Sequence, residues 1–187
     1  ARVIVHPNNP TGQFYGAQDL DAPLTTVDES FCDVAPDRSL LRHAPRQGLI
    51  VLKSFGKFWG LAGLRLGFAI GARAEVERLT DMLGPWPISG PALEIGAMAL
   101  NDPDWARETR VRLNEEAARL DALMWRAGAE AVAGCALFRL YRVKSAAAWQ
   151  ARLAEHRILI RVFPYADDLI RLGLPGPEGW ARLEAAL

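Results

Sequence analysis

Short apolar runs alternate with polar segments rich in proline and glycine along the first seventy residues. These runs are of strand length. They lie at residues 3–5, 24–27, 49–52 and 66–70. Two of the intervening stretches, 16–22 and 37–43, predict short helices. A strand–helix–strand rhythm is typical of βα units, so the pattern predicts an α/β fold with a mainly parallel sheet.

Longer stretches with helical periodicity follow. They predict helices at 72–82, 90–100 and 104–126, with Ser89 as the N-cap of the second. In the third, apolar side chains recur at helical spacing and predict a buried face. These side chains are Leu113, Ala117, Leu120 and Met124.

The last third of the chain mixes both periods. It predicts strands at 136–143, 158–162 and 168–172, helices at 146–156 and from 177 onward, and a turn between Gly128 and Gly134. This mixture favours a small α+β domain. We therefore expect two domains: the later half of a large α/β domain over 1–103, and a small C-terminal domain over 104–187.

Composition narrows the range of functions. Lys plus Arg and Asp plus Glu are both 22, so the formal net charge is zero and bulk charge gives no sign of a nucleic-acid partner. No apolar stretch is long enough for a membrane span, and two cysteines form no disulfide framework, which favours a cytoplasmic protein. The chain lacks an initiator methionine and begins almost within a strand, which predicts that an N-terminal part is missing.

The segment between the runs at 49–52 and 66–70 carries the most distinctive chemistry. It holds Ser54, Lys57 and Arg65. Aromatic neighbours on both sides predict that Lys57 loses solvation and that its pKa falls, as imine chemistry requires. A hydroxyl and a guanidinium suit a phosphate. The segment predicts a lysine that forms a Schiff base with a phosphorylated aldehyde; the alternative is a solvated loop lysine beside a surface arginine.

The same segment resembles a known family. Ser54-x-x-Lys57 followed by Leu-Ala-Gly-Leu-Arg-Leu-Gly at 61–67 is similar to the cofactor-lysine segment of fold-type I aminotransferases, which use pyridoxal 5′-phosphate (PLP). The resemblance implies a three-layer large domain, present here in part. It also implies that Lys57 carries PLP as a Schiff base and that Ser54 and Arg65 bind its phosphate.

Two earlier segments extend the resemblance. The loop at 8–12, Asn-Asn-Pro-Thr-Gly, resembles the family's asparagine loop, with His6 where an asparagine is usual. It implies that Asn9 donates a hydrogen bond to the ring oxygen of PLP; the alternative is a plain turn. Asp28 matches the aspartate that pairs with the pyridine nitrogen, although it could instead cap a helix. Phe31 occupies a position where many relatives have tyrosine, and it cannot donate the tyrosine's hydrogen bond.

Two arginines lie in apolar strands of the last third. By the resemblance, Arg171 binds the α-carboxylate of the substrate, with a structural ion pair as the alternative. Arg161 is a candidate for a phosphate contact or another structural pair. Histidines at 6, 43 and 156 lack metal-ligand spacing, so we expect no metal site.

Within the superfamily, the segment 54–63, together with Gly-Pro-Trp at 84–86, looks most like threonine-phosphate decarboxylases of cobalamin biosynthesis. This branch implies a lyase that converts L-threonine O-3-phosphate to aminopropanol phosphate. Histidinol-phosphate aminotransferase is the neighbouring alternative. The resemblance further implies a homodimer with no nucleic-acid or membrane partner. A regulator's non-catalytic effector domain, or an interaction domain with coincidental motifs, are alternatives of other classes.

Overall fold

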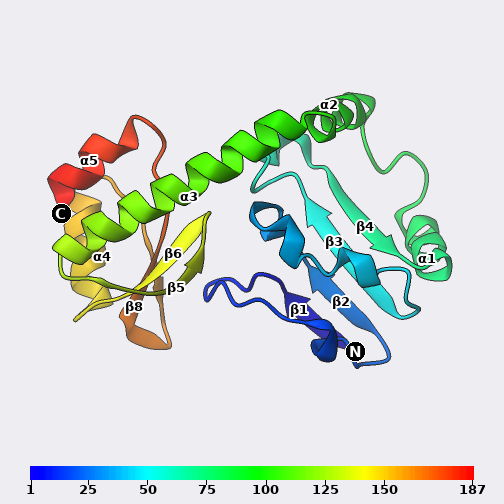
Figure 1. Cartoon of the computed structure of the whole chain (residues 1–187), viewed down its shortest axis with the longest axis horizontal. Helices are drawn as coiled ribbons and strands as arrows, with labels where there is room; N and C mark the ends of the chain where they lie inside the picture. The colour runs from blue at the N-terminus through cyan, green and yellow to red at the C-terminus, as the bar shows by residue number, and fades with distance from the viewer. The chain divides into compact units, whose positions relative to one another are not determined.

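The computed structural model describes all 187 residues (Figure 1). The chain forms two compact units. The first contains residues 1–9 and 13–106, and the second contains residues 10–12 and 107–187. Each unit has its own sheet and is described separately.

The first unit is built on a four-stranded sheet in the order β1-β2-β3-β4. Its strands are β1 (Arg2–Val5), β2 (Thr25–Asp28), β3 (Leu49–Ser54) and β4 (Gly67–Gly71). Neighbours β1, β2 and β3 are parallel, whereas β4 pairs antiparallel to β3. The four strands and the mainly parallel sheet predicted from the sequence are therefore confirmed.

The connections between these strands contain only single 3-10 turns where short helices were expected. The turns are η1 (Ala17–Asp19), η2 (Cys32–Val34), η3 (Pro36–Arg38), η4 (Leu41–His43) and η5 (Ala62–Leu64). The prediction of one helix over 37–43 is wrong, because Ser39 is extended and separates two turns. Proline at the start of η3 also limits how the segment can coil.

Alternation along the strands gives this sheet two different faces. One face carries buried apolar residues that pack under the turns after β1 and β2. They are Ile4, Leu20, Val27, Leu40, Ala44, Leu49 and Val51. The opposite face carries Asp28 and Leu52, which are paired in register and only partly buried.

Two helices complete the first unit: α1 (Arg73–Leu83) and α2 (Gly90–Leu100). The Ser89 hydroxyl accepts a hydrogen bond from the amide of Ala92 at 3.4 Å, so the predicted cap of α2 is confirmed. Gly96 allows α2 to lie close to the residue before β4, because a Cβ there would come within 2.3 Å of the Leu66 side chain. The helix thereby covers the segment that joins β3 to β4.

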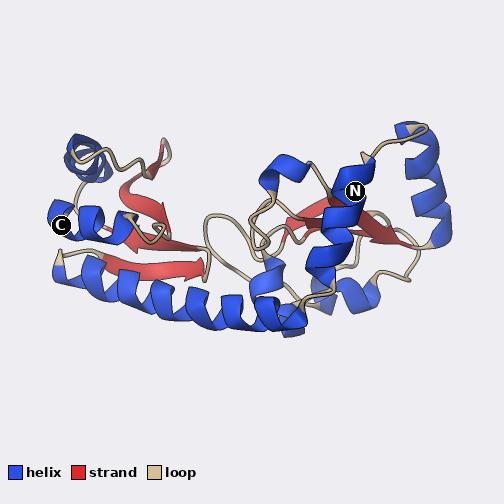
Figure 2. Cartoon of the chain, turned by 90° about the horizontal axis from the view of Figure 1, so that it is seen from above, coloured by secondary structure: helices blue, strands red, loops and turns tan.

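The second unit contains an antiparallel sheet in the order β5-β6-β8-β7. Its strands are β5 (Glu130–Cys135), β6 (Phe138–Arg142), β7 (Arg161–Phe163) and β8 (Ala166–Gly173). Its helices are α4 (Ala146–Glu155), α5 (Gly179–Ala186) and most of α3 (Pro103–Arg126), which Figure 2 shows as one unbroken helix. The predicted turn over 128–134 is wrong for most of its length, because β5 occupies it and pairs with β6.

A single core joins the helices and strands of the second unit. The face of α3 predicted to be buried is buried, and Leu120 and Met124 are fully enclosed. Asp121 on the same helix receives two hydrogen bonds from Arg139, at 3.0 and 2.8 Å, and one from the Tyr141 hydroxyl at 2.7 Å. This network ties α3 to β6.

Residues 10–12 belong to the second unit although the chain around them belongs to the first. The Gly134 amide donates to the Thr11 carbonyl at 3.1 Å. Gly12 has φ +67°, and a Cβ there would lie 2.0 Å from the Gly134 carbonyl oxygen. Glycine is therefore required at position 12 both by backbone conformation and by close approach. None of the helices has the length and apolar character needed to cross a membrane.

Leu153 and Leu159 provide a matched test of the second core. Leu153 is fully buried, whereas Leu159 is 94% exposed. We expect Leu153→Ala to lower the free energy of unfolding by about 2–5 kcal/mol, because it removes buried methyl groups and leaves a cavity. Leu159→Ala should leave stability nearly unchanged. Urea denaturation followed by circular dichroism measures both, and equal effects would show that Leu153 is not part of the core.

Candidate active site

The parallel strands of the first unit direct three candidate residues to one edge of its sheet. The carboxyl ends of β1, β2 and β3 lie together, because Val5, Asp28 and Leu52 are neighbours in register. The loop with Asn9 follows β1, Asp28 ends β2, and the turn with Lys57 follows β3. Ligands of open α/β sheets bind at such an edge.

The pleat separates two adjacent acids, Asp28 and Glu29. Asp28 lies on the more open face, and the Ser30 amide and hydroxyl donate to its Oδ1 at 2.9 and 2.5 Å. Glu29 points to the other face and is fully buried. The two acids therefore have different environments, and Asp28 is the one available to a ligand on the open face.

Lys57 does not have the environment predicted from its neighbours. Phe55 and Phe58 are buried, but Lys57 itself is exposed, so the expected loss of solvation is wrong. The Phe55 and Phe58 rings contact Trp59. The Lys57 ammonium lies 5.5 Å from the centre of the Phe31 ring, within the range of a cation–π contact. The structure therefore brings Lys57 and Phe31 together.

Ser54 and Arg65 line one small hollow with a volume of about 200 Å³. Gly56, Ala62, Leu66 and Gly67 complete its wall. The Gly56 amide donates to the Ser54 hydroxyl at 3.1 Å. Arg65 is exposed, donates to the Ala62 carbonyl at 3.2 Å, and adopts a left-handed backbone conformation with φ 53°. Side chains other than glycine rarely adopt this conformation, and such strain is concentrated at functional sites.

Arg161 and Arg171 lie opposite each other in the second unit, on paired strands β7 and β8. Like charges at directly opposed positions repel. Burial lowers the pKa of Arg171, and the charge of Arg161 lowers it further. The Arg171 guanidinium also lies 5.4 Å from the centre of the Phe138 ring. This pair of cations favours an anionic group between or beside them.

A buried ionic group that sequence reasoning missed surrounds Glu29. Its carboxylate accepts from the Ser39 hydroxyl at 2.7 Å, the Leu40 amide at 2.6 Å and the Lys53 ammonium at 3.3 Å. Lys53 also lies 2.6 Å from Asp33. The signal in the sequence was Lys53, which follows the apolar run 49–52 directly, where a charge needs a partner.

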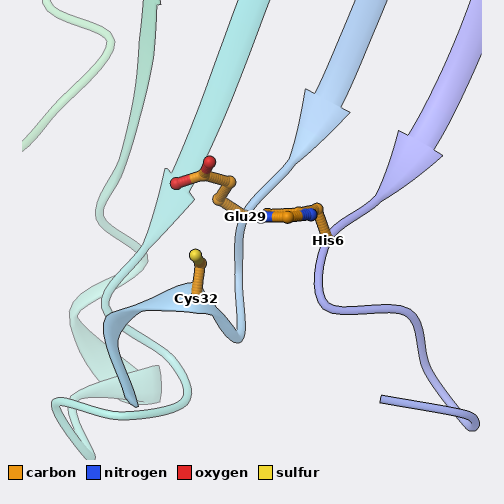
Figure 3. A group of neighbouring side chains, drawn as sticks. All are labelled: His6, Glu29 and Cys32. Carbon is orange, nitrogen blue, oxygen red and sulfur yellow. The ribbon is translucent and has the colours of Figure 1, made fainter. Parts of the chain in front are cut away.

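His6 and Cys32 lie beside Glu29 at the ends of the strands, as Figure 3 shows. All three are buried, and their possible metal-ligand atoms lie within 4.8 Å of one another. However, the His6 Nε2 atom lies 2.8 Å from the Arg38 carbonyl, and the Tyr15 amide donates to Nδ1 at 3.0 Å. Both ring nitrogens are thus engaged, as are both oxygens of Glu29. The group is a hydrogen-bonded part of the core rather than a set of free ligands.

Comparison with known proteins identifies the family of this chain. The sequence profile described as aminotransferase class I and II matches residues 3–185. The chain belongs to this family. A threonine-phosphate decarboxylase of Pseudomonas aeruginosa is 43% identical over 195 residues, which cover 99% of this chain and 59% of that protein. A histidinol-phosphate aminotransferase of Bradyrhizobium diazoefficiens is 30% identical over 197 residues, covering 98% and 56%.

A solved structure confirms the fold of the aminotransferase family. Histidinol-phosphate aminotransferase from Sinorhizobium meliloti, in complex with PLP, matches with a TM-score of 0.87 at 21% identity, covering 99% of this chain and 55% of that one. The α/β architecture expected from the sequence is thereby confirmed. The chain spans less than two thirds of the length of each of these relatives.

The cofactor of the aminotransferase family is PLP, and the residues present fit it. The hollow lined by Ser54 and Arg65 offers a hydroxyl, a guanidinium and backbone to a phosphate. Lys57 lies between these two residues in the sequence and is accessible. Asp28 provides a carboxylate on the open face of the same sheet edge.

The reactivity of Cys32 tests the burial of the cluster formed by His6, Glu29 and Cys32. Burial, and then the charge of Glu29, raise the pKa of the Cys32 thiol to about 12. At pH 8 the thiolate is therefore scarce. In a Cys135→Ser variant, we expect iodoacetamide to alkylate Cys32 on the order of a thousandfold more slowly than a free cysteine, and unfolding in guanidinium chloride to restore the rate. Mass spectrometry follows the reaction, and rapid labelling of the folded protein would contradict the described environment.

Proposed function

We propose that this chain carries the lysine-bearing part of a PLP-dependent enzyme that decarboxylates L-threonine O-3-phosphate. The observation that carries the proposal is the hollow lined by Ser54 and Arg65, because it offers a hydroxyl and a guanidinium to a phosphate and its wall includes Gly56, the residue before the exposed Lys57, in a family that uses PLP. The 43% identical relative, named a threonine-phosphate decarboxylase, supports this substrate.

The residues of the first unit have separate tasks in this proposal. Lys57 would hold the cofactor covalently, and Ser54 and Arg65 would hold its phosphate. Asp28 would keep a proton on the pyridine nitrogen, and Asn9 would donate to the ring oxygen. When bound, PLP supplies an electron sink for negative charge that develops at the substrate's Cα.

Phe31, the aromatic neighbour of Lys57, affects which residue can donate a hydrogen bond to the cofactor. Phe31 lies beside the Lys57 ammonium but has no hydroxyl, so it offers an aromatic face and no hydrogen bond to the cofactor. The contact with the ring oxygen then depends on Asn9. Lys57 would also move a proton to or from the substrate.

The paired arginines of the second unit would bind a substrate with two anionic groups. Arg171 would hold the carboxylate through its planar fork, and Arg161 would contact the phosphate. By fixing the carboxylate, Arg171 helps to determine which bond at Cα breaks. Loss of carbon dioxide from threonine phosphate, with a proton delivered to Cα, leaves aminopropanol phosphate. A role in cobalamin biosynthesis follows from this product and is part of the proposal.

Histidinol-phosphate aminotransferase activity is the second candidate, and the 30% identical relative favours it. Both activities begin with a phosphorylated amine, so binding alone does not separate them. The two reactions differ in their products: decarboxylation releases carbon dioxide, and transamination needs an oxo-acid acceptor and yields its amino acid. Radiolabelled threonine phosphate and a 2-oxoglutarate-dependent assay distinguish them. Release of carbon dioxide from threonine phosphate is the expected result.

We also propose that the protein acts as a cytoplasmic homodimer, as the family resemblance implies. Light scattering after size-exclusion chromatography measures the oligomeric state. A monomer with full activity would contradict this part of the proposal.

Replacement of the lysine tests cofactor attachment directly. We expect PLP, followed by borohydride reduction and peptide mapping, to leave a stable adduct on Lys57. Lys57→Ala should abolish the adduct, because the attacking amine is gone, without altering the circular dichroism spectrum, because the side chain is exposed. An unchanged adduct in this variant would contradict the assignment.

Replacement of Arg171 tests substrate binding. We expect Arg171→Ala to weaken binding of threonine phosphate by about thirtyfold or more, since a lost charge partner in a desolvated site typically costs 2 kcal/mol or more. Affinity for PLP should not change. Arg142→Ala is the control, because Arg142 lies on the same sheet but is exposed and faces Glu130 and Asp168. Calorimetric titration measures these affinities, and equal losses in both variants would refute a specific role for Arg171.

A further inference from the structure

Trp59 connects the lysine-bearing turn to the segment that follows β2. It comes two residues after Lys57, and its indole Nε1 donates a hydrogen bond to Asp33 Oδ2 at 3.1 Å. Asp33 lies in η2, five residues after Asp28. One hydrogen bond therefore joins the two segments that carry the candidate lysine and the candidate aspartate.

The acceptor of this bond is itself fixed by charge. The Lys53 ammonium lies 2.6 Å from Asp33 Oδ1 and 3.3 Å from Glu29 Oε2, and the three side chains are largely buried. Burial is the largest single influence and by itself would lower the pKa of Lys53, but Asp33 and Glu29 act together against it and the pKa is raised, so Lys53 stays cationic. Asp33, Lys53 and Trp59 border an apolar hollow of about 240 Å³, and charges interact more strongly beside apolar surroundings.

The donor is fixed by aromatic packing. The Trp59 ring stacks on Phe55 and on Trp105, with ring centres 5.5 Å apart in both pairs and interplanar angles of 20° and 15°. The Phe58 ring meets Trp59 edge-on at 5.2 Å. These contacts hold the indole in one orientation, with its N–H toward Asp33.

The turn above this anchor is held by its own backbone. The Gly60 amide donates to the Lys57 carbonyl at 3.0 Å, and the Leu61 amide donates to the Phe55 carbonyl at 2.9 Å. Lys57 is thus the exposed tip of a short hydrogen-bonded turn. The side chain that anchors this turn to the rest of the unit is Trp59, two residues after Lys57.

We propose that Asp33 and Trp59 are positioning residues. Their hydrogen bond holds the turn that carries Lys57 at a fixed position relative to the segment that carries Asp28. The inference rests on the proposed function and deepens it, because it explains how an exposed lysine is held in place for cofactor attachment. Neither residue needs to touch the cofactor. Lys53 acts one step further away, because its ion pair with Asp33 at 2.6 Å holds the Asp33 carboxylate in place.

The test compares two tryptophans of the same stack. Trp59→Phe keeps an aromatic ring but removes the N–H that bonds to Asp33, whereas Trp105→Phe makes the same change in a ring that stacks on Trp59. In cofactor-free protein, we expect Trp59→Phe to speed hydrogen exchange of the Gly60 and Leu61 amides about tenfold or more, as loss of a hydrogen bond to a charged group implies. Exchange in β3 should not change. Trp105→Phe should leave both nearly unchanged.

Cofactor attachment gives the second measurement. In Trp59→Phe, we expect slower formation of the borohydride-trapped adduct on Lys57 and a shifted pH dependence of its absorbance. Equal behaviour of the two tryptophan variants in both measurements would overturn the proposal. If the wild-type protein forms no adduct, the proposed function fails, and the exchange data still decide whether Trp59 fixes the turn.

Asp33→Asn provides a variant that keeps the shape of the site. The amide oxygen can still accept from Trp59, but the pairing with Lys53 loses its charge. We expect faster exchange of the Gly60 and Leu61 amides than in wild type, but slower than in Trp59→Phe. Wild-type exchange and wild-type adduct formation in Asp33→Asn would show that the ion pair has no positioning role.

Discussion

The buried carboxylate of Glu29 is the constraint on which the active-site edge depends. A charge enclosed in a protein core needs hydrogen bonds and a counter-ion, and its removal from water costs several kcal/mol without them. Here the Ser39 hydroxyl and the Leu40 amide supply partners from one segment of the chain, and the Lys53 ammonium supplies another from β3. Because each must be present at once, the ends of β2 and β3 and the turn before η4 have one arrangement.

This constraint lies on the opposite face of the sheet from the candidate chemistry. The alternation of a strand turns Asp28 toward the open face and Glu29 toward the core. Under the proposed function, Asp28 faces the cofactor, and Glu29 fixes the backbone that presents Asp28. Two adjacent acids would thus divide a chemical role and a structural role between the two faces of the sheet.

The sequence was sufficient for most strands and helices, because their apolar periods are strong and their caps are local. It was also sufficient for Ser54, Lys57 and Arg65 as candidates, since these lie within one short segment. It failed for β5, because its alanines and glycine have little strand propensity and the strand is defined by its pairing with β6. It also failed for the environment of Lys57, because the neighbouring rings of Phe55, Phe58 and Trp59 contact one another and Lys57 stays exposed. Contacts such as Asp33 with Trp59 join residues 26 positions apart, and no local pattern encodes them.

Arg65 shows a conflict between two demands at a single position. Its backbone is left-handed, which glycine adopts freely and arginine does not. Its side chain, however, supplies the cation on the wall of the phosphate-sized hollow. Selection for thermal robustness alone would place glycine there and relieve a strain on the order of 1 kcal/mol. Under the proposed function, Arg65 therefore gives up backbone stability for phosphate binding, and an effort to stabilise the chain by relaxing this backbone would remove the cation that holds the cofactor.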